Sequence, residues 1–160
     1  MWQNELVLYV RHLINDLVQP YTYDDSRLES TVIVAFQLLK FDVQLYTTYT
    51  LDLDACSLSP DPTESPRDDD VIALVILKAA CIILGATAQA NIGRSVRVID
   101  GPSTIDMTGV YKAAQERYKD ICKEYEQAVL NYQSGIQGWG EAITSALTVE
   151  NINILPWNFS

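Results

Sequence analysis

Apolar residues recur at helical spacing in four stretches of this chain. The first stretch covers residues 4–18 and closes before Pro20, and a second begins near Asp24 and Asp25, either of which can cap its first amides. A third stretch covers 70–90, and a fourth covers 110–132. The pattern predicts four helices joined by shorter segments.

Three of these helices have a single apolar seam, which is typical of helices packed in a bundle. The first seam consists of Leu6, Val10, Leu13, Ile14 and Leu17. The second consists of Leu28, Val32, Ala35 and Leu39. The fourth helix has a heptad-like seam of Ala114, Tyr118, Ile121, Tyr125, Ala128 and Tyr132. We expect this last seam to pack inside the bundle, although its tyrosines could instead face a partner chain.

The third helix is apolar on nearly every face, with Lys78 as its single charge and Asp68 to Asp70 as its expected cap. A membrane span over Val71 to Ala90 is the alternative, but a mid-span lysine costs roughly 2.5–3.5 kcal/mol on insertion scales. We therefore predict a buried helix and no membrane. A helix without a polar face needs cover on all sides, and neighbouring subunits could supply part of it, which favours an oligomer.

Between the third and fourth helices, residues 95–108 have the composition of a β-hairpin. Strand-forming residues flank the turn sequence Asp100 to Ser103. A lone two-stranded hairpin is marginally stable in water. It should therefore lie either on the extended segment predicted near Tyr46 to Leu53 or on a neighbouring chain, to which its edges offer unpaired backbone groups.

The last segment, residues 134–160, combines glycines with apolar residues, and we expect these apolar side chains to be covered and not exposed to water. Either it folds back on its own core or it is an arm that docks on another chain. The fold class expected is therefore mainly α, a bundle of about four helices with a projecting hairpin and an extended C-terminal arm. Its expected divisions are a bundle over 1–133, with the hairpin at 95–108, and an arm over 134–160.

Charge and cysteines narrow the possible functions. The net charge of −10 and the pI near 4.3 argue against a protein that grips nucleic acid over its whole surface. The three cysteines are odd in number and widely spaced, so we expect reduced, mostly buried thiols in a cytosolic folding compartment. Charges within the apolar N-terminal stretch argue against a secretory signal.

Candidate chemistry is sparse, and we expect no catalytic residues, metal site or cofactor. The single histidine, His12, is expected to be structural and partly buried. Asp52 and Asp54 begin a calcium-loop pattern that then fails at the sixth and twelfth positions. The rival hypothesis is a small metal-dependent hydrolase that uses Asp52, Asp54 or the run from Asp68 to Asp70.

The order of elements resembles the head–tail connector, or adaptor, proteins of tailed bacteriophages. The resemblance covers roughly residues 4–132: a helix, a capped helix, the apolar helix "DDDVIALVILKAACIIL", the hairpin "VRVIDGPSTIDMTG" and the helix "YKAAQERYKDICKEYEQAVLNY". The proline-containing loop from Ser59 to Pro66 departs from it. The alternative outside the virus is a cellular helical-bundle interaction module.

This resemblance implies a non-enzymatic virion protein, assembled in the host cytoplasm. It implies a homo-oligomeric ring, usually of twelve copies, between the portal protein and the tail or neck proteins. Double-stranded DNA would pass through the ring without sequence-specific binding, since an acidic protein has few cations to replace the counterions of DNA. The interface candidates that follow are Val96, Val98, Ile99, Ile105 and Met107 in the hairpin and Ile154, Leu155, Trp157 and Phe159 in the arm.

Overall fold

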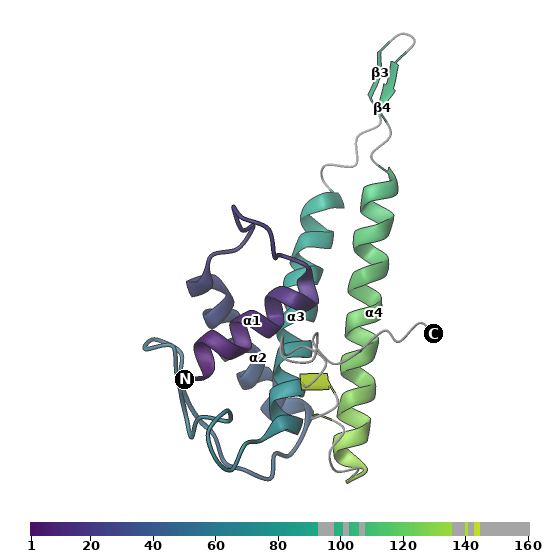
Figure 1. Cartoon of the computed structure of the whole chain (residues 1–160). Coiled ribbons are helices and arrows are strands. Elements are labelled where there is room, and N and C mark those ends of the chain that lie inside the picture. The colour runs from purple at the N-terminus through teal and green to yellow at the C-terminus, as the bar shows by residue number, and fades with distance from the viewer. Residues whose placement is uncertain (93–97, 101–102, 106–107, 136–139, 141–142, 145–160) are drawn as a thin grey trace, which may run out of the picture.

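A computed structural model of the chain describes residues 1–92, 98–100, 103–105, 108–135, 140 and 143–144 (Figure 1). Within this part of the chain lie four helices and two separate two-stranded antiparallel sheets. The helices are α1 (Trp2–Ile14), α2 (Asp25–Asp42), α3 (Asp69–Ile92) and α4 (Thr108–Gln133). The strands are β1 (Thr50–Asp52), β2 (Ser57–Ser59), β3 (Val98–Asp100) and β4 (Ser103–Ile105). The predicted mainly helical class with a hairpin is confirmed.

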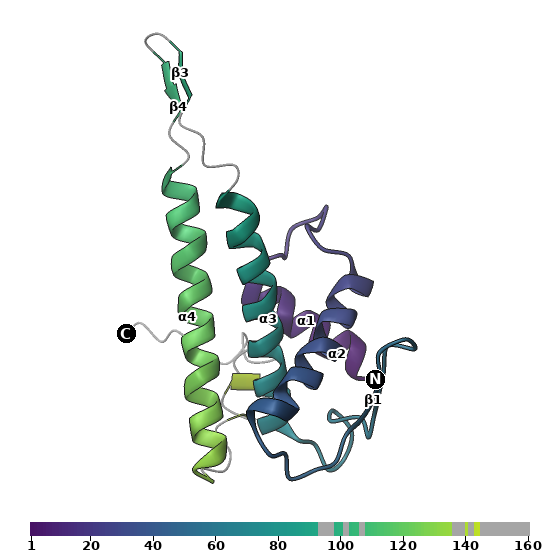
Figure 2. The same ribbon diagram turned by 180° about the vertical axis from the view of Figure 1, so that it is seen from behind.

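Helix α3 is the centre of the bundle. It runs antiparallel beside α4, while α1 and α2 cover its other side (Figures 1 and 2). Every residue from Val71 to Leu77 is at most 1% exposed. Helices α1, α2 and α4 of the same chain cover the first half of α3, so this half needs no neighbouring subunit, and the oligomer stays a prediction.

Helix α3 also has the length and composition needed to cross a membrane, over Asp69–Ala90. Of its most apolar stretch, 61% is buried against the rest of the chain. The core helix of a bundle has the same composition as a membrane span, since both are surrounded by apolar groups. The burial favours the core-helix interpretation, and the absence of a membrane partner stays a prediction.

Two helix ends differ from those expected. Helix α1 ends at Ile14, because Asn15 adopts a left-handed conformation with φ 60° and its amide bonds back to the carbonyl of His12. Leu17 consequently lies outside the helix and is exposed, so its assignment to the seam is wrong. Asp24 occupies the N-cap position of α2, but its carboxylate accepts a hydrogen bond from the Ser26 hydroxyl instead of capping an amide.

The predicted start of α3 and the predicted seam of α4 are confirmed. Asp68 caps α3, since its Oδ1 accepts the amide of Val71 at 3.2 Å. The α4 seam faces the core, with four buried members and two half-buried ones towards the start of the helix. The buried members are Ile121, Tyr125, Ala128 and Tyr132.

Each hairpin forms its own sheet. Strand β1 pairs with β2, with Leu51 opposite Leu58, and this places a strand within the extended segment expected near Tyr46 to Leu53. Strand β3 pairs with β4, with Val98 opposite Ile105 and Asp100 opposite Ser103. The second pairing confirms a hairpin within 95–108 that turns at the expected place.

The described residues after α4 return to the bundle. The Gly140 amide donates to Asp70 Oδ1 at 2.9 Å, and the Thr144 hydroxyl donates to Asp69 Oδ1 at 3.1 Å. A Cβ on Gly140 would collide with the backbone of Asp69 and Asp70, so glycine permits this close approach. Gly140 and Thr144 therefore lie against the start of α3.

Candidate interaction site

The β3–β4 hairpin stands beyond the adjacent ends of α3 and α4, away from the remaining helices (Figures 1 and 2). Its sheet contains two strands, and β1 pairs with β2, so neither edge of the hairpin pairs with another described strand. Of the two supports expected for it, strand pairing with the 46–53 segment is therefore not found. The hairpin has the form of a projecting contact element.

The interface candidates are placed unequally. Val98, Ile99 and Ile105 occupy strand positions of the hairpin. Val96 and Met107 lie outside the described residues, as do Ile154, Leu155, Trp157 and Phe159 of the expected arm. The structure thus brings the three strand positions together at one end of the molecule.

We call the hairpin together with the helix ends that carry it the stalk. It consists of residues 89–92 of α3, strands β3 and β4, and residues 108–120 of α4. We call the other described parts of the four helices the core bundle. None of residues 112–120 is buried. The described contacts of this half of α4 include the Tyr118 ring, which packs over Gly85, and a hydrogen bond of 2.7 Å from Arg117 to the Leu13 carbonyl. A Cβ at position 85 would approach Tyr118 to 3.0 Å, so glycine is what lets the ring lie this close.

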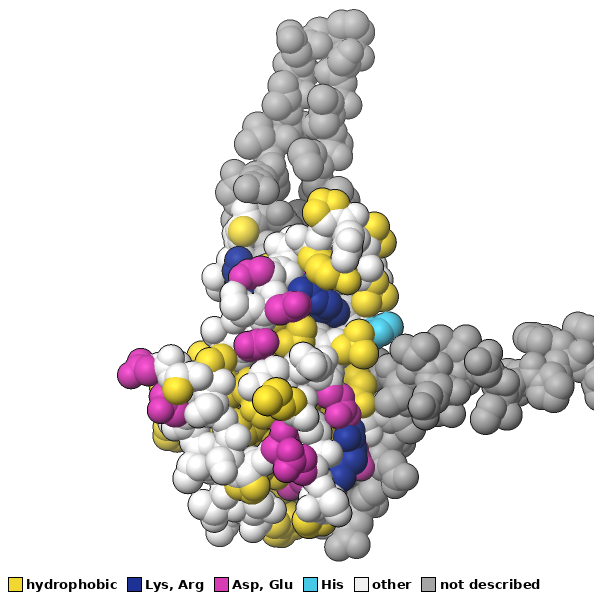
Figure 3. Space-filling view, turned by 60° about the vertical axis from the view of Figure 1, so that its left-hand side comes forward, with side chains coloured by type: hydrophobic (Ala, Val, Ile, Leu, Met, Phe, Trp, Pro, Cys, Tyr) yellow, Lys and Arg dark blue, Asp and Glu magenta, His cyan; other side chains and the backbone are white. Residues whose placement is uncertain are grey.

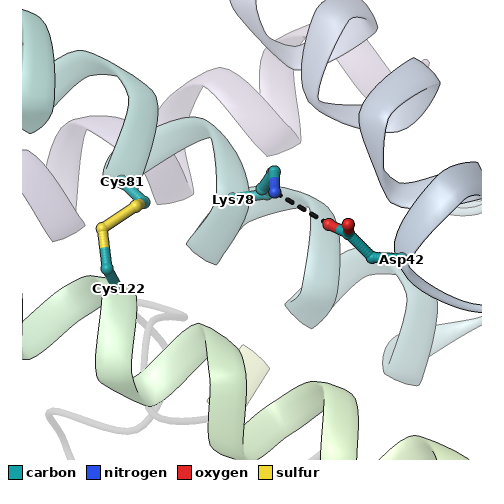
Figure 4. Close-up of a disulfide and its surroundings, with 4 residues drawn as sticks. All are labelled: Asp42, Lys78, Cys81 and Cys122. Atoms are coloured by element: carbon teal, nitrogen blue, oxygen red, sulfur yellow. Dashed lines mark hydrogen bonds and ion pairs between the residues drawn. A yellow bond between two sulfur atoms is a disulfide. The ribbon is translucent and has the colours of Figure 1, made fainter.

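Cys122, next to the border between stalk and core bundle on α4, is joined to Cys81 of α3 (Figure 4). Their Cα atoms are 5.2 Å apart, within the usual range for a disulfide. The expectation of three reduced, mostly buried thiols is wrong for this pair, because the α3–α4 packing brings together two half-buried cysteines 41 residues apart. Cys56 is the free cysteine.

One turn from the disulfide, Lys78 is neutralised by a residue of α2. Its Nζ donates to Asp42 Oδ2 at 2.8 Å and lies 4.5 Å from the centre of the Tyr125 ring (Figure 4). The Tyr125 hydroxyl donates to the same Asp42 oxygen. Burial alone would raise the pKa of Asp42, but these two hydrogen bonds outweigh it and leave the pKa lowered. Burial and the Asp42 carboxylate both raise the pKa of Tyr125.

These residues border a surface hollow of about 580 Å³ between α3 and α4. Its lining includes both bonded cysteines together with Lys78, Asp42 and Tyr118. From the sequence alone, Lys78 is a lone charge and the cysteines are expected to be reduced, mostly buried thiols. The overlooked signal is that Cys122 directly follows a seam residue, Ile121, which places it next to the partner helix.

The acidic residues of the hydrolase hypothesis have structural roles. Asp52 Oδ1 accepts the amides of Asp54 and Ala55 in the β1–β2 turn. Asp68 caps α3 and accepts the Tyr49 hydroxyl, and Asp69 accepts Arg67 Nε at 2.6 Å. No group of three or more potential metal ligands is found among the described residues. The arrangement therefore gives the hydrolase hypothesis no support.

A second polar cluster ties α1 to α2. Arg11 is buried and donates to Asp16 at 2.9 Å, to Asp25 at 2.6 Å and to the Tyr23 carbonyl. Burial would raise the pKa of Asp16, but amide hydrogen bonds from Thr22 and Tyr23, with the Arg11 charge, lower it. The cluster positions the first two helices, and His12 beside it is partly buried as expected.

The molecular surface combines acidic residues with exposed apolar ones. On the face in Figure 3, carboxylates are spread among hydrophobic side chains, and basic groups lie close to carboxylates. On α2, Val34, Leu38 and Phe41 follow helical spacing and are all exposed. Such a row is typical of a contact surface.

Comparisons of this chain with protein-family models, curated proteins and solved structures give no match.

Proposed function

We propose that this chain is a structural, non-enzymatic head–tail adaptor of a tailed bacteriophage. In this proposal, identical copies form a ring, usually of twelve, that binds the portal protein on one side and tail or neck proteins on the other. The ring belongs to the virion and is assembled in the host cytoplasm. Double-stranded DNA passes through its channel without sequence-specific binding.

The observation that carries this proposal is the unsupported β3–β4 hairpin. Two strands alone bury little surface, so they gain stability when another chain covers a face or adds a strand. A repeated contact between the hairpin of one copy and a different surface of the next is heterologous, and such contacts close into rings when their rotation permits. The exposed α2 row offers apolar area for a contact of this kind.

The charge of the chain supports the proposed DNA passage. A net charge of −10 means that copies lining a channel would repel phosphates more than they attract them. DNA that releases few counterions on contact stays weakly bound and free to slide. The net charge of the chain therefore suits a channel through which DNA passes better than a module that binds DNA.

The experiment is assembly of a double variant, Val98→Asp with Ile99→Asp. The particle mass of wild type and variant is measured by light scattering, alone and with the portal protein of the same phage. We expect rings from wild type and monomers from the variant, with the helical circular dichroism of the variant intact. Leu53→Asp is the matched control, because Leu53 is an exposed apolar residue of the other hairpin and its replacement should leave assembly unchanged.

Two results would contradict the proposal. A wild-type chain that stays monomeric with the portal protein present is not a ring-forming adaptor. If the Val98 and Ile99 variant loses its helical signal, the hairpin is part of the folding core and not a contact element. Electron microscopy of the assembled species then gives the copy number directly.

A further inference from the structure

Cys122, which is bonded to Cys81 of α3, lies at a boundary in packing along α4. After this boundary, Tyr125, Ala128 and Tyr132 are buried against α3 and the core. Before it, residues 112–120 are half-buried or exposed. Cys122 is therefore the covalent anchor at the point where the first half of α4 leaves the core bundle.

We propose that the Cys81–Cys122 bond is a reversible redox clamp, which fixes the stalk and with it the hairpin to the core bundle. The bond closes a segment that contains the end of α3, both hairpin strands and the start of α4. The described contacts that remain for the first half of α4 when the bond is open include Tyr118 over Gly85 and the hydrogen bond from Arg117, and none of residues 112–120 is buried. The inference is independent of the adaptor role, since it concerns one copy of the chain.

Access to the bond supports reversibility. Both cysteines are half-buried, and both line the 580 Å³ hollow that opens between α3 and α4. Thiol–disulfide exchange requires a thiolate to reach a sulfur atom, so solvent access determines whether a bond can be opened under mild conditions. Figure 4 shows the bond running from α3 to α4.

The reaction that we propose needs one partner, a small-molecule disulfide such as oxidised glutathione. One cysteine thiolate attacks that disulfide, forms a mixed disulfide and releases one small thiolate. The second cysteine thiolate then attacks the mixed disulfide, forms the Cys81–Cys122 bond and releases the second small thiolate. Two electrons pass from the protein to the small molecule, and the two cysteine protons end on the two released thiols. Opening is the reverse reaction.

The first test counts thiols in the full chain. The protein is equilibrated in a glutathione buffer rich in either the oxidised or the reduced form, quenched with acid, alkylated and weighed by mass spectrometry. We expect one alkylated cysteine, Cys56, in the oxidised buffer and all three in the reduced buffer. A Cys56→Ser variant serves as the control. It should have no alkylated cysteine in the oxidised buffer and two in the reduced buffer.

The second test locates the effect by hydrogen exchange. Opening the bond should speed amide exchange in residues 112–120 roughly tenfold, while residues 125–132 change by less than about twofold, because local opening and global unfolding are separate events. The Cys81→Ser, Cys122→Ser double variant should behave like the reduced protein in both buffers. Reduced wild type supplies the same comparison if that variant fails to fold.

Three outcomes overturn the proposal. A bond that survives reduced glutathione is a permanent cross-link and not a clamp. Three reactive thiols after treatment with oxidised glutathione mean that the bond does not form in solution. Equal acceleration of exchange on both sides of Cys122 means that the bond stabilises the whole bundle and not the stalk.

Discussion

Helices α3 and α4 run through both the core bundle and the stalk, yet their packing differs between the two regions. In the core bundle, α3 is enclosed by three helices and its side chains are buried from Val71 to Leu77. In the stalk, none of residues 112–120 of α4 is buried, and their described contacts include one ring contact and one hydrogen bond, with the disulfide close by. The difference shows that one chain can enclose the first half of α3 while residues 112–120 of α4 stay largely uncovered.

The largest effect should come from opening a cavity in the core bundle. Phe36 of α2 is fully buried and lies 5.2 Å from Tyr49 between ring centres, so Phe36→Ala should lower the free energy of unfolding by about 3–5 kcal/mol. Phe41→Ala is the control, since its ring is 78% exposed, and it should cost less than about 0.5 kcal/mol. Urea unfolding measures both. Equal losses would mean that the outer face of α2 is also covered in solution.

The next largest effect should come from the polar cluster of Arg11. Replacing Arg11 by methionine leaves Asp16 buried without its cationic partner, and should cost about 3 kcal/mol. Arg27→Met is the comparison, because Arg27 is exposed and its guanidinium lies 4.9 Å from the Tyr23 ring centre, a contact worth about 0.5–1 kcal/mol. Thermal unfolding distinguishes the two. A mild effect at Arg11 would show that the two amides bonded to Asp16 are sufficient to hold it.

Alkaline pH should weaken the core bundle more than the stalk. Burial and the nearby carboxylates of Asp68 and Asp42 raise the pKa values of Tyr49 and Tyr125. Since an unfolded tyrosine has a pKa of about 10, this contribution is complete below pH 10 and is lost as pH rises further. Unfolding temperatures measured from about pH 8 to pH 11 should therefore fall at the upper end.

Tyr125→Phe should cost about 1.5 kcal/mol near neutral pH, because it removes a hydrogen bond to a carboxylate, and should also flatten the alkaline decline. Tyr21→Phe is the control, because that ring is exposed. A lowered pKa has the opposite effect on stability, because its contribution is lost as pH falls. The pKa of Asp42 is lowered in the fold, so its contribution disappears as pH falls below about 4. An unfolding temperature that is constant up to pH 11 would contradict the burial of these hydroxyls.

The parts of the fold that could be predicted depend on local signals. The seam of α4 follows from periodicity, and the cap of α3 follows from Asp68 standing before an apolar run. The exposed end of α1 has a local signal as well, Asn15, but the apolar residues after it obscured the boundary.

Other features depend on packing between distant segments. Nothing within α3 reveals that Lys78 meets Asp42, or that Cys81 meets Cys122, because those partners come from α2 and α4. The same reason limits what the sequence says about the cover of α3. An apolar helix shows that cover is needed, but the sequence does not show whether one chain supplies it. The hairpin was predictable because its turn and strands are adjacent in sequence, whereas its lack of a supporting strand was not.

The smallest expected effect tests the comparison most directly. Tyr118 and Tyr125 lie one heptad apart on α4, but the first is half-buried in the stalk and the second is buried in the core bundle. Tyr118→Ala should therefore cost about 1 kcal/mol, against about 3 kcal/mol or more for Tyr125→Ala. Hydrogen exchange adds a spatial readout, since loss of Tyr118 should affect residues 112–120 and leave 125–132 protected. If the two variants lower the free energy of unfolding equally, the first half of α4 unfolds together with the core bundle. Cys122 then marks no boundary in stability.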